Sequence, residues 1–204
     1  MNRSFIKMFA LTICPVFLLS CNNTIEVENQ NGSVGGLIPA AIGNYWIYTD
    51  SSQTLFDTVS ITAKYCSLGY VWWKLQNNSF AMEDFSVEFA NRNDSVFGKT
   101  SNRGGIELVT PTYITPSDST INYYILQGCF IIPRKATFYK RAITVPAGTF
   151  NQYIAYITDY GNDKDSLVIV PEIGVVCRVF QGHANFGSDA YTVKSFLKSY
   201  YLSN

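Results

Sequence analysis

"FDTVSITAKY", residues 56–65, alternates between apolar and polar side chains. In an extended chain the apolar members share one face, namely Val59, Ile61, Ala63 and Tyr65, and the polar members share the other, namely Thr58, Ser60, Thr62 and Lys64. A period of two with this polarity predicts a half-buried β-strand.

Similar short runs occur along most of the chain. The fold is expected to begin at "LIPAAIGNYWIY", and further strand candidates follow at residues 70–76, 85–90, 95–100, 106–110, 121–126, 137–145 and 149–160. The last run, "YTVKSFLKSYYL", fits one face of a helix as well as a strand, but Thr192, Val193 and the late tyrosines favour a strand. We therefore expect a single antiparallel all-β domain, a half-open barrel or a sandwich of about 9–12 short strands with little helix.

Two turns mark hairpins in the last third of the chain. In "VPAGTF", Pro146 presets φ for the second position of a turn and Gly148 can take positive φ at the third, which predicts a type II turn. "GNDKD", residues 161–165, is expected to close the next hairpin.

The composition supports a sheet and excludes some partners. The chain has 14 Tyr, 14 Phe and 3 Trp, and only 15% of its residues are charged, which favours strands. Fifteen basic and fifteen acidic residues balance each other, and no Lys/Arg run occurs. This gives no electrostatic footprint for nucleic acid and no polybasic patch for lipid headgroups.

The N-terminus has the features of a bacterial export signal. Arg3 and Lys7 precede an apolar run, which ends in "LLSC", Leu18 to Cys21. At about 1.5 Å per residue the apolar run reaches roughly 18 Å, which is short of the roughly 30 Å hydrocarbon core. "LLSC" resembles the lipobox of bacterial lipoproteins, which implies acylation of the Cys21 thiol and cleavage before it.

The expected organisation follows from that cleavage. Residues 1–20 are the signal peptide, 21–36 the lipidated N-terminus with a flexible tether rich in polar residues and glycine, and 37–204 the single β domain. Several buried acyl chains hold far more firmly than one, so the mature chain is expected to be anchored without crossing the membrane. Asn22 differs from the Asp that resembles an inner-membrane retention signal, which favours the outer membrane and leaves its face open.

Three motifs together resemble a known family. They are "GNYWIY" at residues 43–48, "VPAGTF" at 145–150 and "PEIGVV" at 171–176. In this order they are similar to the pattern GxYWxY, VPAGTF, PGxGxV of a diffuse family of bacterial secreted proteins and lipoproteins of unknown function, and they fit its looser form PxxGxV at the last motif. Glu172 stands where that pattern has glycine. The resemblance implies an all-β fold, related in some members to the half-barrels of lipoprotein carriers, and it implies no activity.

Three cysteines fall within the expected domain, Cys66, Cys129 and Cys177. Their odd number leaves two alternatives open, one disulfide with a free thiol or three buried thiols. No CxxC spacing indicates zinc or redox chemistry.

No residue set indicates catalysis. His183 is the only histidine, which argues against a triad or a multi-histidine metal site, and it is expected in a solvated turn. Adjacent Glu83 and Asp84 would point to opposite faces of a strand, so they do not form an acid/base pair. Phosphate-binding loops, dinucleotide fingerprints and hydrolase or zinc-protease motifs do not occur. No cofactor and no metal site is predicted.

One acidic cluster invites a calcium hypothesis. It comprises Asp159, Asn162, Asp163 and Asp165. The spacing departs from the twelve-residue calcium loop, and a hairpin turn explains these residues better.

The aromatic residues supply the candidate binding site. Trp72 and Trp73 are neighbours and would face opposite sides of a strand, so one of them can lie outside the core. With Tyr70 nearby, such a Trp could form a stacking platform for sugar rings or a wall for an acyl chain. The alternative is core packing, which is expected for Trp46 and for one of the pair.

The sequence thus favours a lipid-anchored envelope protein with a non-catalytic binding role toward a protein or a glycan. A carrier that holds a hydrophobic ligand in an apolar half-barrel is the alternative, and a hydrolase of unknown type is the second alternative. An apolar cavity would favour the carrier, whereas a filled core with exposed aromatic residues would favour the binding protein.

Overall fold

The computed structural model describes residues 36–76, 81, 88–92, 95–101, 107–117, 119–127, 130–183 and 190–203. The expected signal peptide, Cys21 and all but the last residue of the expected tether lie outside these ranges, as do Glu83, Asp84 and Cys129. The strands are β1 (Tyr45–Thr49), β2 (Phe56–Ser67), β3 (Tyr70–Gln76), β4 (Glu88–Arg92), β5 (Ser95–Ser101), β6 (Glu107–Ile114), β7 (Thr120–Gln127), β8 (Phe130–Tyr139), β9 (Ile143–Val145), β10 (Gly148–Phe150), β11 (Tyr153–Asp159), β12 (Lys164–Val170), β13 (Gly174–His183) and β14 (Ala190–Tyr201).

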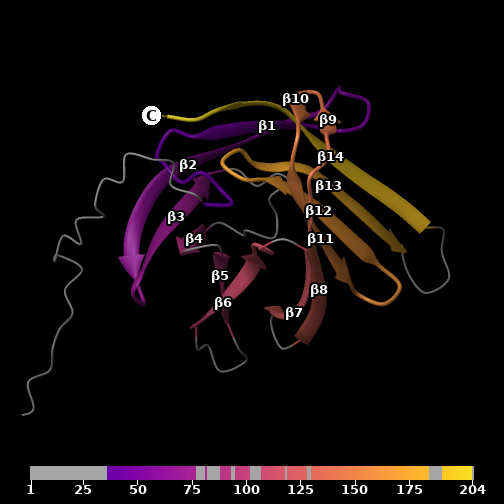
Figure 1. Ribbon diagram of the computed structural model, residues 1–204. Coiled ribbons are helices and arrows are strands. Elements are labelled where there is room, and N and C mark those ends of the chain that lie inside the picture. Colours follow the sequence, from indigo (N-terminus) through magenta and orange to yellow (C-terminus); the bar gives the residue numbers. More distant parts are fainter. Residues whose placement is uncertain are drawn as a thin grey trace, which may run out of the picture.

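The strands confirm the predicted fold class. Twelve of them form one antiparallel sheet in the order β6-β5-β4-β3-β2-β1-β14-β13-β12-β11-β8-β7, and β9 and β10 form a separate hairpin. The sheet curls until it is nearly closed, so β6 and β7, at opposite ends of the strand order, lie side by side (Figure 1). In the described part of the chain no helix is long and apolar enough to cross a membrane.

The alternation in residues 56–65 produces the expected strand. Val59 and Ile61 are buried in the core, and Thr58 is exposed on the other face of β2. An irregularity in the register between Ile61 and Ala63 interrupts the alternation with respect to β3. The C-terminal run also forms a strand, β14, as the sequence favours. It lies between β1 and β13 in the sheet.

The core is built around aromatic side chains whose polar ends are satisfied. Trp46 and Tyr48 of β1 are fully buried. The Trp46 Nε1–H donates to the Ile173 carbonyl at 2.7 Å, and the Tyr48 hydroxyl donates to the Val175 carbonyl at 3.0 Å. These bonds remove the cost of burying an indole N–H and a phenol, so β1 is held against the start of β13.

Side chains close the seam between β6 and β7. Tyr123 of β7 and Arg134 of β8 both donate to the Thr112 carbonyl of β6, at 3.1 and 2.9 Å. The Tyr156 hydroxyl of β11 donates to the Ile114 carbonyl at 3.3 Å. Burial raises the pKa of Tyr123 to about 12, so its hydroxyl stays protonated and able to donate at neutral pH.

The "VPAGTF" hairpin forms, but its predicted turn type is wrong. Val145 pairs with Gly148, so Pro146 and Ala147 occupy the two central positions. Ala147 is not among the residues with positive φ, whereas Gly148, at the fourth position, has φ of 139°. The glycine therefore serves the start of β10 and not the third position of a type II turn.

The departure from the family pattern at Glu172 has a structural consequence. Glu172, which stands where the resembling proteins have glycine, adopts a left-handed φ of 67°. A side chain with a Cβ is strained in this region, whereas glycine is not.

We expect Glu172→Gly to raise the free energy of unfolding by about 0.5–1 kcal/mol in urea titrations. A loss of stability would show that the Glu172 side chain contributes more than the strain costs.

Candidate functional site

The predicted aromatic platform is placed on two faces of the sheet. Trp73 is half-buried, packs against the core and pairs across the strands with Phe89, whereas Trp72 pairs with Tyr65. Trp72 is 0% exposed although it is not a member of the main core cluster. Tyr70, which is half-buried, lies 6.0 Å from Trp72 between ring centres.

The aromatic rings around Trp72 already bind a cation of the same chain. The Lys99 ammonium lies 4.5 Å from the centre of the Trp72 ring and 5.0 Å from that of Tyr65. It donates to the Tyr65 hydroxyl at 2.8 Å and lies 3.5 Å from the Glu88 carboxylate, which accepts a hydrogen bond from Tyr65. Burial and the Glu88 carboxylate raise the pKa of Tyr65, so it stays neutral and is not a nucleophile. The Arg92 guanidinium likewise lies over the Tyr70 ring, 5.4 Å from its centre. A ligand would have to displace these cations in order to stack here.

A row of polar side chains crosses the inner face of five neighbouring strands. Thr158 pairs across the strands with Arg134 on one side and with Asp165 on the other, and Arg178 pairs with Ser195. All five residues are buried. Arg178 donates from Nε and Nη2 to the two oxygens of Asp165, at 3.0 and 2.8 Å. Arg134 Nε donates to the Thr158 hydroxyl at 2.7 Å. These groups satisfy one another, which assigns the row a role in holding the strands in register.

The acidic cluster is divided among different contacts. Asp159 Oδ1 accepts from the backbone N–H of Gly161 in the turn between β11 and β12, at 2.8 Å. Asp163 Oδ1 accepts from the backbone N–H of His183, and Asp165 points inward to its arginine. Within the described ranges no three His, Cys, Asp or Glu side chains are placed to hold a metal ion. His183 lies at the end of β13 and not in a turn.

The described cysteines are free thiols. Cys66 is exposed on β2 and Cys177 is buried in β13, so these two do not pair with each other. Burial raises the pKa of Cys177 to about 11, which keeps this thiol protonated and unreactive at neutral pH.

A groove forms where one strand continues beyond its neighbour. The register between β8 and β11 ends at the pair of Arg134 and Thr158, but β8 begins four residues earlier, at Phe130. On its other side β8 remains paired with β7 as far as Phe130 and Gln127. Within the described part of the chain, Phe130 to Pro133 therefore have no strand partner on the β11 side, where the β11–β12 turn follows.

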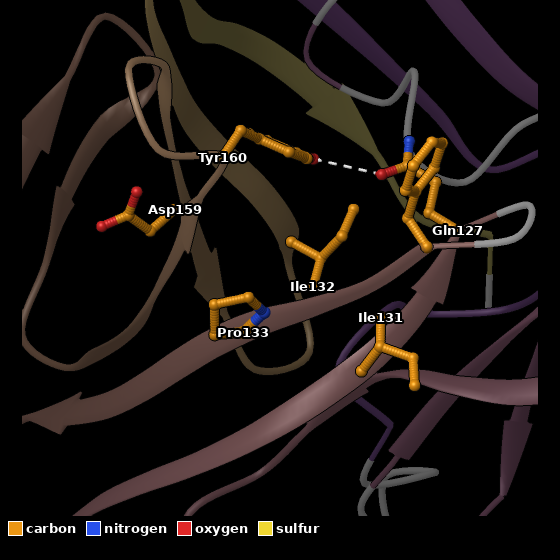
Figure 2. Close-up of a pocket in the computed structure, with 7 residues that line it drawn as sticks. Gln127, Ile131, Ile132, Pro133, Asp159 and Tyr160 are labelled. Carbon is orange, nitrogen blue, oxygen red and sulfur yellow. Dashed lines mark hydrogen bonds between the residues drawn. The ribbon is translucent and has the colours of Figure 1, made fainter.

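The groove has a volume of about 420 Å³. Its lining is mostly apolar and comprises Gln127, Phe130, Ile131, Ile132, Pro133, Asp159 and Tyr160. The Tyr160 side chain reaches across to Gln127, whose Oε1 accepts its hydroxyl hydrogen at 3.4 Å, and Ile132 lies between them (Figure 2).

The apolar residues around the groove are exposed. Phe130 is 69% exposed, Ile131 72% and Tyr160 36%. Tyr124, on the neighbouring strand, is 72% exposed. Single exposed apolar residues are ordinary, but a contiguous group around a groove of this size indicates a binding surface. Among the described lining residues, Asp159 carries the one carboxyl group.

The sequence-based candidates did not include this groove. A usable signal was present in "YYILQGCFII", residues 123–132, a run without charge in which apolar residues are direct neighbours. Since neighbours on a strand face opposite sides, some of these residues had to lie outside the core. The end of β11, which creates the groove, has no equally local signal.

Comparisons with known proteins assign no family. No family model matches the chain, and no curated protein matches it. Among solved structures, that of a candidate lipoprotein from Parabacteroides distasonis is similar, at 12% sequence identity and a TM-score of 0.41, over 83% of this chain and 100% of that one. An identity and a score this low support no conclusion about function.

Proposed function

We propose that this chain is a lipid-anchored protein of the cell envelope, held through acylated Cys21, with a non-catalytic binding role. The observation that carries the binding role is the exposed apolar groove at the β7–β8 hairpin. The anchor is supported by the charged head, the apolar run and the "LLSC" motif of the N-terminus. The proposed destination is the outer membrane, on the basis of Asn22.

The packing of the interior favours a binding protein over a carrier of hydrophobic ligands. Large side chains, among them Trp46, Tyr48, Tyr113 and Tyr156, lie inside the described sheet and are less than 2% exposed. Tyr113 and Tyr156 meet edge to face at 4.8 Å between ring centres. Bulky side chains packed inside a sheet favour a partner that binds at an exposed site, such as the groove.

The anchor is tested by the mass of the chain recovered from its host. We expect the wild-type protein to begin at Cys21 and to carry a diacylglyceryl group. Cys21→Ala is expected to retain residues 1–20 and to lack the acyl mass, because the thiol that receives the lipid is gone. Cys14→Ala is the matched control, since Cys14 lies in the discarded segment and its loss should leave processing unchanged.

Two results of this experiment would count against the anchor. One is a wild-type chain that begins at another residue and carries no acyl group. The other is identical processing of the wild type and Cys21→Ala.

A further inference from the structure

We propose that the groove binds an extended segment of a partner protein, which adds as a strand to the free edge of β8 and carries an arginine beside an apolar side chain. This inference rests on the binding role proposed above and names the class of its partner.

The backbone of β8 provides the docking edge. Residues 130–133 pair with β7 on one side and lie beyond the last β11 partner on the other. In an antiparallel sheet alternate residues direct their N–H and C=O groups to the same neighbour, so part of this stretch faces the groove with backbone groups that a strand could bind. Pro133 offers only its carbonyl. Addition of a strand to such an edge is a recurrent mode of peptide recognition.

The side chains fit the alternating pattern of an extended peptide. Phe130 and Ile132 are two residues apart on β8 and therefore share one face. Both line the groove, together with the ring of Tyr160 from the opposite wall. Apolar side chains at every second position of the partner would contact this face.

The charge of the groove selects the arginine. Among the seven lining residues that the structure describes, Asp159 is the only charged one and none is basic. Lys164 is the strand partner of Asp159, but within the described part of the chain no ion pair joins the two side chains. A guanidinium offers a carboxylate two parallel donors in one plane, which an ammonium does not. The Asp159 side chain points away from the Tyr160 ring (Figure 2), so the carboxylate alone selects the basic residue, and the ring contacts the apolar side chain beside it.

The test uses the mature acylated chain in a detergent without a sugar headgroup. A phage library of random nine-residue peptides is selected on the wild type, and enriched peptides are synthesised and measured by fluorescence anisotropy. We expect them to combine an arginine with apolar residues at alternate positions. Methylation of alternate backbone nitrogens should weaken binding by roughly tenfold or more, because it removes donors to the β8 edge and leaves the side chains intact.

Variants of the protein locate the binding. Asp159→Asn should weaken the arginine peptides by roughly three- to fivefold and leave their glutamine counterparts unchanged. Phe130→Thr, on the docking face and 69% exposed, should weaken both, whereas Leu55→Thr, at a site that is 70% exposed and outside the groove lining, should weaken neither.

The outcomes separate this inference from the proposed function. Peptides that bind equally well after backbone methylation would overturn strand addition. A glycan array that binds the wild type but not Tyr160→Ala, with no peptide enriched, would overturn the peptide partner and leave the binding role intact. An absence of both peptide and glycan binding would overturn the inference and count against the groove as the functional surface.

Discussion

Replacement of Asp165 by alanine is expected to lower the free energy of unfolding by about 3–5 kcal/mol. Asp165 and Arg178 are 2% and 5% exposed, and two hydrogen bonds join them. The substitution removes the carboxylate that accepts two hydrogen bonds from this buried guanidinium. Removal of one member of a buried pair costs more than the pair itself contributes, because the charge that remains is not compensated. Urea unfolding followed by tryptophan fluorescence measures the loss.

Two controls show that the buried position is responsible. Asp163→Ala removes an exposed carboxylate that lies 3.4 Å from His183 Nδ1, and it should cost less than about 1 kcal/mol. The double variant Asp165→Leu with Arg178→Met should recover much of the stability lost by Asp165→Ala, because apolar residues of similar size can replace a buried ion pair. Equal losses for Asp163→Ala and Asp165→Ala would contradict the burial argument.

Gly174→Ala is expected to lower the free energy of unfolding by about 2–4 kcal/mol. Gly174 has φ of 100°, where a Cβ is strained. A Cβ would also lie 3.3 Å from Trp46 Nε1. This indole has little freedom to move, because its N–H is bonded to the Ile173 carbonyl. The cost of backbone strain and the cost of overpacking against Trp46 therefore add up at Gly174.

Gly69→Ala separates the two contributions. Gly69 also has positive φ, 76°, but a Cβ there would meet nothing within 4 Å. Only the backbone strain should appear, about 1 kcal/mol. Thermal and urea unfolding of both variants give the comparison, and equal losses would show that contact with Trp46 adds no cost.

The parts of the fold that depend on local pattern could be predicted from the sequence. Alternation in residues 56–65 marks β2, β-branched and aromatic residues mark β14, and the burial of Trp46 follows from its position in an apolar run. These features need only the period of two and the preference of large apolar residues for the interior.

Features that depend on register between distant strands could not be predicted. Asp165 looks like a turn residue because it closes an Asn/Asp-rich segment, but it is the second residue of β12 and its side chain lies inside, where it accepts hydrogen bonds from Arg178. Lys99 covers the Trp72 ring only because β5 lies two strands away from β3. The groove exists because β8 extends four residues beyond its last pair with β11. The end of a strand is poorly determined by local sequence, so the groove could not be predicted.

The most direct test of a lipid-anchored protein that binds through its groove is site-specific photocrosslinking in the host cell. A photoreactive amino acid replaces Ile131, which is 72% exposed in the groove, or Leu55, which is 70% exposed and is not part of its lining. We predict a discrete crosslinked species in the membrane fraction from position 131 that is weakened by Tyr160→Ala and is missing from position 55. The same products from both positions, or none from position 131, would contradict the account.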